Sequence, residues 1–230
     1  MSDLVSYSLE DGVAIIAMDD GKANVISPDM ISQLNAALDQ AEAAKAVVIL
    51  TGREGMFSGG FDLKIMMQGP VQALGLTCDG SRLAIRLLSF PTPVIAAPSG
   101  HAIAMGAFLL LSCDYRIGVE NTKTGLNETQ IGMTMHHFGI ELARERISKR
   151  HLTRSLINAE IFAPEEAVHA GFLDMVVPAE DLKETAMFAA KQMKQLSMNA
   201  FKGTKLKSRK AFLERLAEAL AEDEKMADNL

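Results

Sequence analysis

The stretch SGHAIAMGAFLLLSCDY, residues 99–115, is almost entirely apolar, and its place in the chain determines how the rest is interpreted. Residues 98–101 interrupt the apolar run, so its uninterrupted part extends only over residues 102–111. A helix needs about 20 apolar residues to cross a bilayer. We therefore expect no membrane span. We predict a strand over residues 93–100 that ends at proline and glycine, then a buried helix that begins near Met105.

Strands and helices alternate on both sides of this stretch. Residues 5–18 read as two strands joined at Asp11-Gly12, and AVVILTG, residues 46–52, is typical of a strand covered on both faces. The other predicted elements are a helix from Ser27-Pro28 to Ala41, a loop over 52–61, a helix over 74–88, a strand over 115–119, a short helix from Ala163 to Gly171, a strand-like run over 172–178 and helix beyond Ala179. This pattern predicts an α/β fold with a core over residues 1–178 and a helical C-terminal region over residues 179–230.

Composition limits the kinds of protein this can be. The 230 residues are 48% hydrophobic and carry a formal net charge of -6, which suits one globular unit and disfavours a nucleic-acid partner, because that needs clustered cations. Cys78 and Cys113 are too few for a disulfide framework and lack the spacing of metal ligands. The opening residues MSDLVSYSLED lack the features of a signal or transit peptide. We expect a cytoplasmic protein without a metal site.

Two glycine-rich turns follow predicted buried strands. FSGGFDL, residues 57–63, comes after the strand at 46–52, and SGHAIAMG, residues 99–106, comes after PVIAAP. Glycine allows a ligand to approach the backbone closely, and the start of a helix leaves amide groups free. Two such amides aimed at one point form an oxyanion hole. The alternative is that the glycines only permit tight turns. Neither turn matches a nucleotide-phosphate loop.

In order and spacing, these turns and the later LNETQIGM, residues 126–133, resemble the signature segments of the crotonase (enoyl-CoA hydratase/isomerase) superfamily. The resemblance covers nearly the whole chain, including KANVIS at 22–27 and APEEAVHAGFLDMVVP at 163–178, and it is greatest to the delta3,delta2-enoyl-CoA isomerases. It implies a spiral of ββα units with a C-terminal helical trimerisation region, a homotrimer or hexamer, and an acyl-CoA substrate with no further cofactor. It also implies that the amides of Phe61 and Met105 form the oxyanion hole.

The acid and base groups of the family determine the reaction. Hydratases carry a first glutamate three residues after the second oxyanion donor, a position that is Phe108 here. The later carboxylate is present as Glu128, the position of the single base in the isomerases. One carboxylate fits the shift of a 3-enoyl-CoA double bond to 2-trans-enoyl-CoA better than the addition of water. The alternatives are a hydratase or other enolate-forming enzyme, and a catalytically weak acyl-CoA-binding scaffold.

The resemblance also implies a set of substrate-binding residues: Ala23, Ser58, Gly60, Asp62, Leu63, Ala104 and Phe108. If Met105, Phe108, Met133 and Met135 line the pocket around Glu128, burial should raise the pKa of the Glu128 carboxyl. Without the resemblance, Glu128 would be interpreted as a surface glutamate.

Two further features have alternative interpretations. His136 and His137 are either polar helpers near the acyl chain or neighbours that point in different directions at a helix start. FKGTKLKSRK, residues 201–210, has five cations and is either a solvated helix face or a segment that attracts the phosphates of coenzyme A. The chain ends in AEDEKMADNL and lacks the aromatic and lysine pair with which family members often contact the nucleotide.

Overall fold

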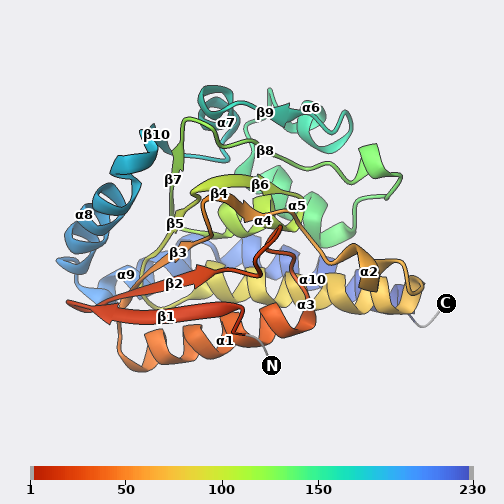
Figure 1. Ribbon diagram of the computed structural model, residues 1–230. Coiled ribbons are helices and arrows are strands. Elements are labelled where there is room, and N and C mark those ends of the chain that lie inside the picture. Colours follow the sequence, from red (N-terminus) through yellow and green to blue (C-terminus); the bar gives the residue numbers. More distant parts are fainter. Residues whose placement is uncertain (1–2, 228–230) are drawn as a thin grey trace.

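The structure of the protein, a computed structural model, describes residues 3–227. A six-stranded sheet has the order β1-β2-β3-β5-β7-β10 (Figure 1). Its strands are β1 Val5–Glu10, β2 Val13–Met18, β3 Val47–Thr51, β5 Val94–Ala97, β7 Tyr115–Val119 and β10 Met175–Val177. The predicted hairpin is confirmed: β1 and β2 pair antiparallel, with φ of 51° at Asp11 and 75° at Gly12. The remaining neighbours pair in parallel.

A second sheet of four short strands has the order β4-β6-β8-β9. These strands are β4 Gly55–Ser58, β6 Gly100–Ile103, β8 Thr124–Gly125 and β9 Ile161–Phe162. The buried strand predicted over residues 93–100 is confirmed as β5, which ends at Ala97 before Pro98, and the last predicted residue, Gly100, starts β6 of the other sheet. The loop predicted over residues 52–61 contains β4.

Glycine lets β4 and β6 pair closely. Gly55 lies opposite Gly100, where a Cβ atom would lie 1.9 Å from the carbonyl carbon of Gly55. The strand pair therefore requires glycine at position 100, whereas Gly55, where a Cβ atom would meet nothing within 4 Å, is favoured by its φ of 76°.

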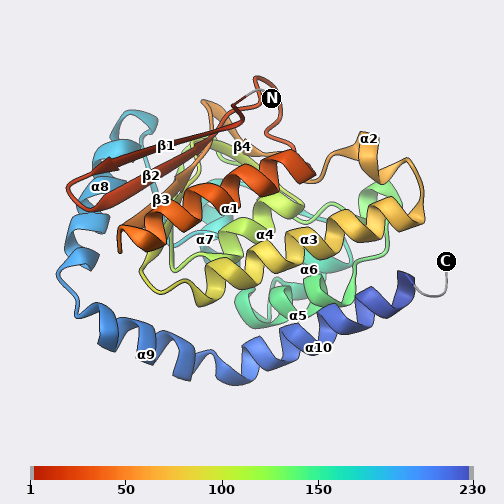
Figure 2. The same ribbon diagram turned by 90° about the horizontal axis from the view of Figure 1, so that it is seen from below.

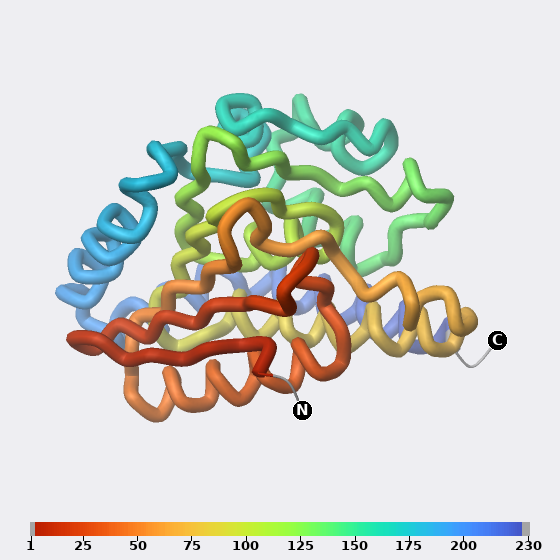
Figure 3. The backbone as a smooth tube through the Cα atoms, viewed as in Figure 1, coloured from red at the N-terminus to blue at the C-terminus, as the bar shows by residue number. Residues whose placement is uncertain are grey.

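Strand pairs and helices repeat along the chain. One strand of the large sheet is followed by one of the small sheet and then by helix, as in β5, β6 and α4 (Figure 3). This path is the spiral of ββα units that the resemblance implies. The helices are α1 Pro28–Ala43, α2 Leu63–Met66, α3 Pro70–Ser89, α4 Met105–Ser112, α5 His137–Arg146, α6 Leu152–Leu156, α7 Pro164–Ala170, α8 Leu182–Lys194, α9 Met198–Ser208 and α10 Lys210–Ala227, with 3-10 turns η1 Thr129–Ile131 and η2 Ala179–Asp181.

The helices cover both faces of the large sheet. One apolar core joins the sheets to α1, α3, α4, α5 and α10, and a second lies between the large sheet and α8 (Figures 1 and 2). All residues of α4 are buried, which explains its uniformly apolar sequence. Among the described residues, no helix is both long and apolar enough to cross a membrane.

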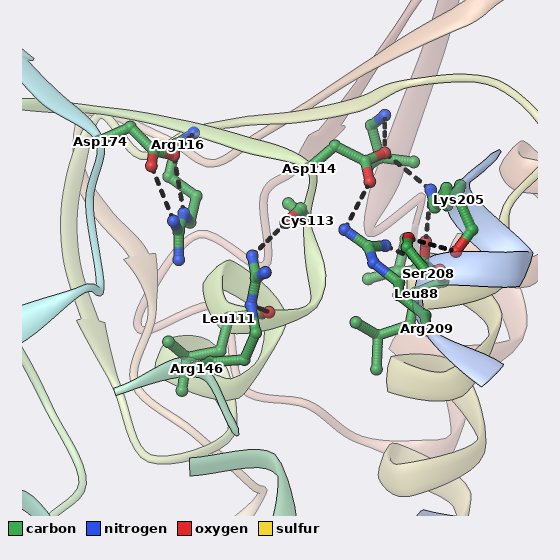
Figure 4. A network of polar contacts seen from close by, with 12 residues as sticks. Leu88, Leu111, Cys113, Asp114, Arg116, Arg146, Asp174, Lys205, Ser208 and Arg209 are labelled. Carbon is green, nitrogen blue, oxygen red and sulfur yellow. Dashed lines mark hydrogen bonds and ion pairs between the residues drawn. The ribbon is translucent and has the colours of Figure 1, made fainter. Parts of the chain in front are cut away.

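The basic segment at residues 201–210 is partly buried in the fold. Lys205 is only 6% exposed, and its Nζ lies 2.7 Å from Oδ2 of Asp114. Arg209 approaches the other oxygen of the same carboxylate at 2.9 Å (Figure 4). The remaining cations are exposed: Lys202, Lys207 and Lys210. Two of the five cations therefore attach α9 to the start of β7, which neither interpretation of this segment included.

Arg146 of α5 fixes the C-terminal end of α4. Its Nε donates to the carbonyl oxygen of Leu111 at 2.8 Å, and its Nη2 donates to that of Cys113 at 3.0 Å (Figure 4). A cation at the carboxyl end of a helix also complements the helix dipole. The first turn of α4, where Met105 lies, therefore belongs to a helix that is anchored at its far end.

Candidate active site

Two turns meet at the start of α4. Ala104, the N-cap of this helix, has φ 52° and ψ -121°, a conformation that alanine seldom adopts. The amide of Ala104 donates to the carbonyl oxygen of Gly125 at 2.9 Å, which fixes the turn against β8. Gly60 has φ 101°, and a Cβ atom there would lie 2.8 Å from Cβ of Ala104 and 3.6 Å from the amide nitrogen of Met105. The structure thus brings the two glycine-rich turns together.

The amides of Phe61 and Met105 remain available to a ligand. Ile26 donates to the carbonyl oxygen of Gly60 at 2.8 Å and accepts from Asp62 at 3.2 Å, so this backbone pairing leaves out the amide of Phe61. Met105 is the first residue of α4, where an amide has no acceptor within the helix. Neither amide donates a hydrogen bond to any of residues 3–227. These are the donors that the resemblance implies for an oxyanion hole.

A buried asparagine shapes the first turn. Asn24 is fully buried with φ 49°, and its carbonyl oxygen accepts a hydrogen bond of 2.8 Å from the Ser58 hydroxyl. The same hydroxyl accepts from the amide of Gly60 at 3.2 Å, and Gly59 donates to the carbonyl oxygen of Ala23 at 2.8 Å. Ala23 and Ser58, both predicted to bind substrate, therefore hold the backbone that precedes Phe61. No local sequence pattern marks Asn24 as part of the site, although asparagine tolerates positive φ well.

Gly80 of α3 leaves room for the side chains of Phe61 and Met105. A Cβ atom at Gly80 would lie 2.6 Å from Cε1 of Phe61 and 3.2 Å from Cε of Met105. The side chains of Phe61 and Met105 thus lie together on the surface of α3.

The next two predicted binding residues start a helix. The carboxylate of Asp62 accepts from the amide of Lys64 at 2.9 Å and so caps α2, whereas Leu63 is 54% exposed. Leu63 is available to a ligand at the surface, and the carboxylate of Asp62 stabilises the first turn of α2.

Glu128 lies three residues after the strand that supports the Ala104 turn. Its carbonyl oxygen accepts from the amide of Met133 at 2.9 Å, which closes the short turn around η1. Its Oε2 is buried and has no hydrogen-bond partner among residues 3–227. Burial raises the pKa of this carboxyl to about 7, against a hydrogen bond from the amide of Glu128 itself that lowers it. The expected direction of the pKa shift is thus confirmed.

Phe108 lies one helical turn beyond Met105 and is only 1% exposed. Its ring meets the His136 imidazole edge to face, with centroids 5.8 Å apart and an interplanar angle of 81°. Burial lowers the pKa of His136 to about 4, so the imidazole is neutral at physiological pH. His137 is exposed, and its Nδ1 lies 3.5 Å from a carboxylate oxygen of Glu222. The two adjacent histidines therefore point in different directions.

A cavity of about 630 Å³ lies beside the segment that follows Glu128. Its mainly apolar lining includes Met133 and Met135, two of the residues expected around the carboxylate. The other two, Met105 and Phe108, are in the buried core, with Met135 packed against that core. The four residues therefore divide between the cavity and the interior. Within the described part of the chain, no cluster of at least three His, Cys, Asp or Glu residues could hold a metal ion.

Comparison with known proteins gives consistent matches along the chain. The sequence model of the enoyl-CoA hydratase/isomerase family matches residues 8–230. Human mitochondrial enoyl-CoA delta isomerase 1 is 32% identical over 219 residues, which cover 93% of this chain and 72% of the relative. A probable enoyl-CoA hydratase of Bacillus subtilis is 28% identical over 193 residues, covering 81% of this chain and 75% of the relative. A solved structure of an enoyl-CoA hydratase/isomerase family protein from Pseudomonas syringae has a TM-score of 0.95 and 56% identity, with 97% of each chain covered.

Proposed function

The chain belongs to the enoyl-CoA hydratase/isomerase family, and we propose that it is an isomerase that converts 3-enoyl-CoA to 2-trans-enoyl-CoA. The observation that carries the proposal is the contrast between Glu128 and Phe108. One buried carboxyl has a pKa of about 7, and the position of the first glutamate of hydratases is occupied by a buried aromatic ring. A double-bond shift needs one group that accepts and returns a proton, and Glu128 meets that need.

In this mechanism, Glu128 removes a proton from C2 of the acyl chain and the thioester becomes an enolate. The amides of Phe61 and Met105 donate hydrogen bonds to the enolate oxygen, and each donor contributes roughly 3–4 kcal/mol to transition-state stabilisation. The protonated Glu128 then returns the proton to C4, which leaves the double bond between C2 and C3. A pKa near 7 suits both halves of this transfer, since the group is neither fully ionised nor fully protonated at neutral pH.

The coenzyme A thioester is the substrate, and the proposed chemistry needs no further cofactor. We also propose that the protein is a homotrimer or hexamer in the cytoplasm. Light scattering coupled to size-exclusion chromatography tests the assembly, and a single species with the mass of one chain would contradict it.

Separate assays of the purified protein with 3-enoyl-CoA and 2-trans-enoyl-CoA test the reaction. We expect isomerisation of the first substrate and at most slow hydration of the second. Rapid hydration without isomerisation would favour the hydratase alternative, which the name of the Bacillus relative supports. Tight acyl-CoA binding with turnover that is insensitive to Glu128→Ala would instead indicate a binding scaffold.

A further inference from the structure

The N-terminus of α5 is capped by a residue from the last helix. The residue that precedes α5, His136, makes no side-chain capping bond. Instead, Oδ1 of Asp223 in α10 accepts from the amide of His137 at 2.8 Å, and Oδ2 accepts from the amide of Phe138 at 2.9 Å. Asp223 is only 1% exposed. A buried carboxylate with an amide donor on each oxygen is a strong, fixed contact at a helix start.

This cap fixes the aromatic group that lies against α4. The ring of His136 stacks on Phe138, with centroids 6.2 Å apart and an interplanar angle of 13°, and it also makes the edge contact with Phe108. Phe108 belongs to the helix whose first amide, at Met105, is the proposed oxyanion donor. A chain of direct contacts therefore runs from Asp223 through the start of α5 and His136 to Phe108.

We propose that Asp223 is a positioning residue for the reaction: by capping α5 from the last helix, it holds the His136 imidazole in place against Phe108. The contribution to turnover rests on the proposed isomerase function, whereas the effect on the imidazole does not. The position matters because Phe108 lies one turn beyond Met105 on α4, so a displaced ring would disturb the packing of the turn that carries the proposed oxyanion donor.

The charged groups around the imidazole define its titration. Asp223 favours the protonated form and His137 opposes it, while burial is the largest effect and favours the neutral form. The packed helix α4 contributes no charged side chain, and Glu222 of α10 faces His137. If the cap is lost and the first turn of α5 opens, water reaches His136 and its pKa should rise toward the ordinary value near 6.5.

The first test follows the imidazole by NMR. The His136 signal is assigned by its absence in His136→Phe, and it is titrated from pH 5 to 8 in the wild type, Asp223→Ala and Asp223→Asn. We expect no midpoint in this range for the wild type, a midpoint near 6 to 6.5 for Asp223→Ala, and a smaller change for Asp223→Asn, whose amide oxygen can still accept one bond. Glu222→Gln, an adjacent change that leaves the two capping bonds intact, should behave as the wild type.

The second test measures turnover of 3-enoyl-CoA by the same variants. We expect kcat/KM of Asp223→Ala to fall between roughly tenfold and a hundredfold, with a further decline below pH 6.5 as His136 becomes charged. Adding His136→Phe should remove that further decline, because phenylalanine retains an aromatic contact without titrating. If Asp223→Ala does not fold, Asp223→Asn provides the comparison.

The proposal is overturned if His136 titrates near 6.5 in the wild type, or if the folded variants show wild-type titration and wild-type pH profiles. A wild-type protein without isomerase activity that still shows the expected NMR changes would contradict the proposed function, and it would restrict the role of Asp223 to fixing the imidazole.

Discussion

Replacing Glu128 by glutamine should abolish most of the activity and make the folded protein more stable at alkaline pH. Loss of a positioned general base typically lowers the rate by about 10²–10⁴-fold. The stability gain arises because the carboxyl has a pKa of about 7 in the fold and an ordinary value of 4.5 when unfolded. The folded state therefore binds more protons between these values, and its stability falls as the pH rises through them.

The expected size of the effect follows from the shift. One pKa unit corresponds to about 1.4 kcal/mol, so the ionised, buried carboxylate costs the wild type about 3 kcal/mol at pH 8 and less than about 1 kcal/mol at pH 5. Glutamine carries no charge, and any cost of its own buried amide is the same at both values. The stability difference between Glu128→Gln and the wild type should thus grow by about 2 kcal/mol from pH 5 to pH 8, on the order of 5 °C in Tm.

Urea unfolding at pH 5 and pH 8 measures this difference, and Glu120→Gln, at an exposed position, is the matched control. The pH profile of kcat/KM in the wild type should have an acid limb with a midpoint near 7 that is absent from any residual activity of Glu128→Gln. Equal stability differences at both pH values, together with a midpoint near 4.5, would show that Glu128 is solvated and would refute the argument from burial.

Three further substitutions test the surroundings. Gly80→Ala places a methyl group 2.6 Å from the ring of Phe61, so we expect the free energy of unfolding in urea to fall by about 1–3 kcal/mol and kcat/KM to fall at least roughly tenfold. Unchanged kinetics would contradict the packing of Phe61 and Met105 together on α3. Phe108→Glu buries a carboxyl at a 1% exposed position, so we expect isomerisation to fall and the stability to drop by several kcal/mol, with any new hydration of 2-enoyl-CoA measured in parallel. Full isomerase activity would show that the packing of Phe108 against α5 does not support the reaction. Asp114→Asn leaves Lys205 and Arg209 without their carboxylate, so we expect the free energy of unfolding to fall by about 3–5 kcal/mol, measured by thermal or urea unfolding. A loss below about 1 kcal/mol would show that other contacts hold α9.

Local patterns were enough to predict much of the large sheet. The Asp11-Gly12 turn and the continuous apolar run of β3 each carry a signal within a few residues, and the structure contains both elements. The small sheet gives little local signal, because its strands are two to four residues long and three of the four contain glycine. β4 pairs with β6 through contacts such as that of Gly55 with Gly100, which join residues that are distant in sequence.

The site was predictable only in part, because it too depends on contacts between residues that are distant in sequence. Spacing and resemblance indicated the backbone positions Phe61 and Met105, and the free amides at both positions agree with that role. The groups that hold the site in shape are long-range. Ser58 bonds to Asn24, 34 residues away, and Asp223 bonds to the start of α5 over 85 and 86 residues. No periodicity or local motif links such residues, because only the fold brings them together.

Burial raises the pKa of Glu128 and lowers the pKa of His136, because in both groups it disfavours the charged form. His136, with a pKa of about 4 in the fold and 6.5 unfolded, makes stability fall as the pH drops from 6.5 to 4. Glu128 makes stability fall as the pH rises from 4.5 to 7. Between pH 4.5 and 6.5 the two effects largely cancel, so a flat profile in the wild type would not mean that neither group is buried. The single variants separate them: Glu128→Gln should become more stable as the pH rises through this range, and His136→Phe should become less stable. Slopes of the same sign in the two variants would show that burial does not shift both pKa values as described.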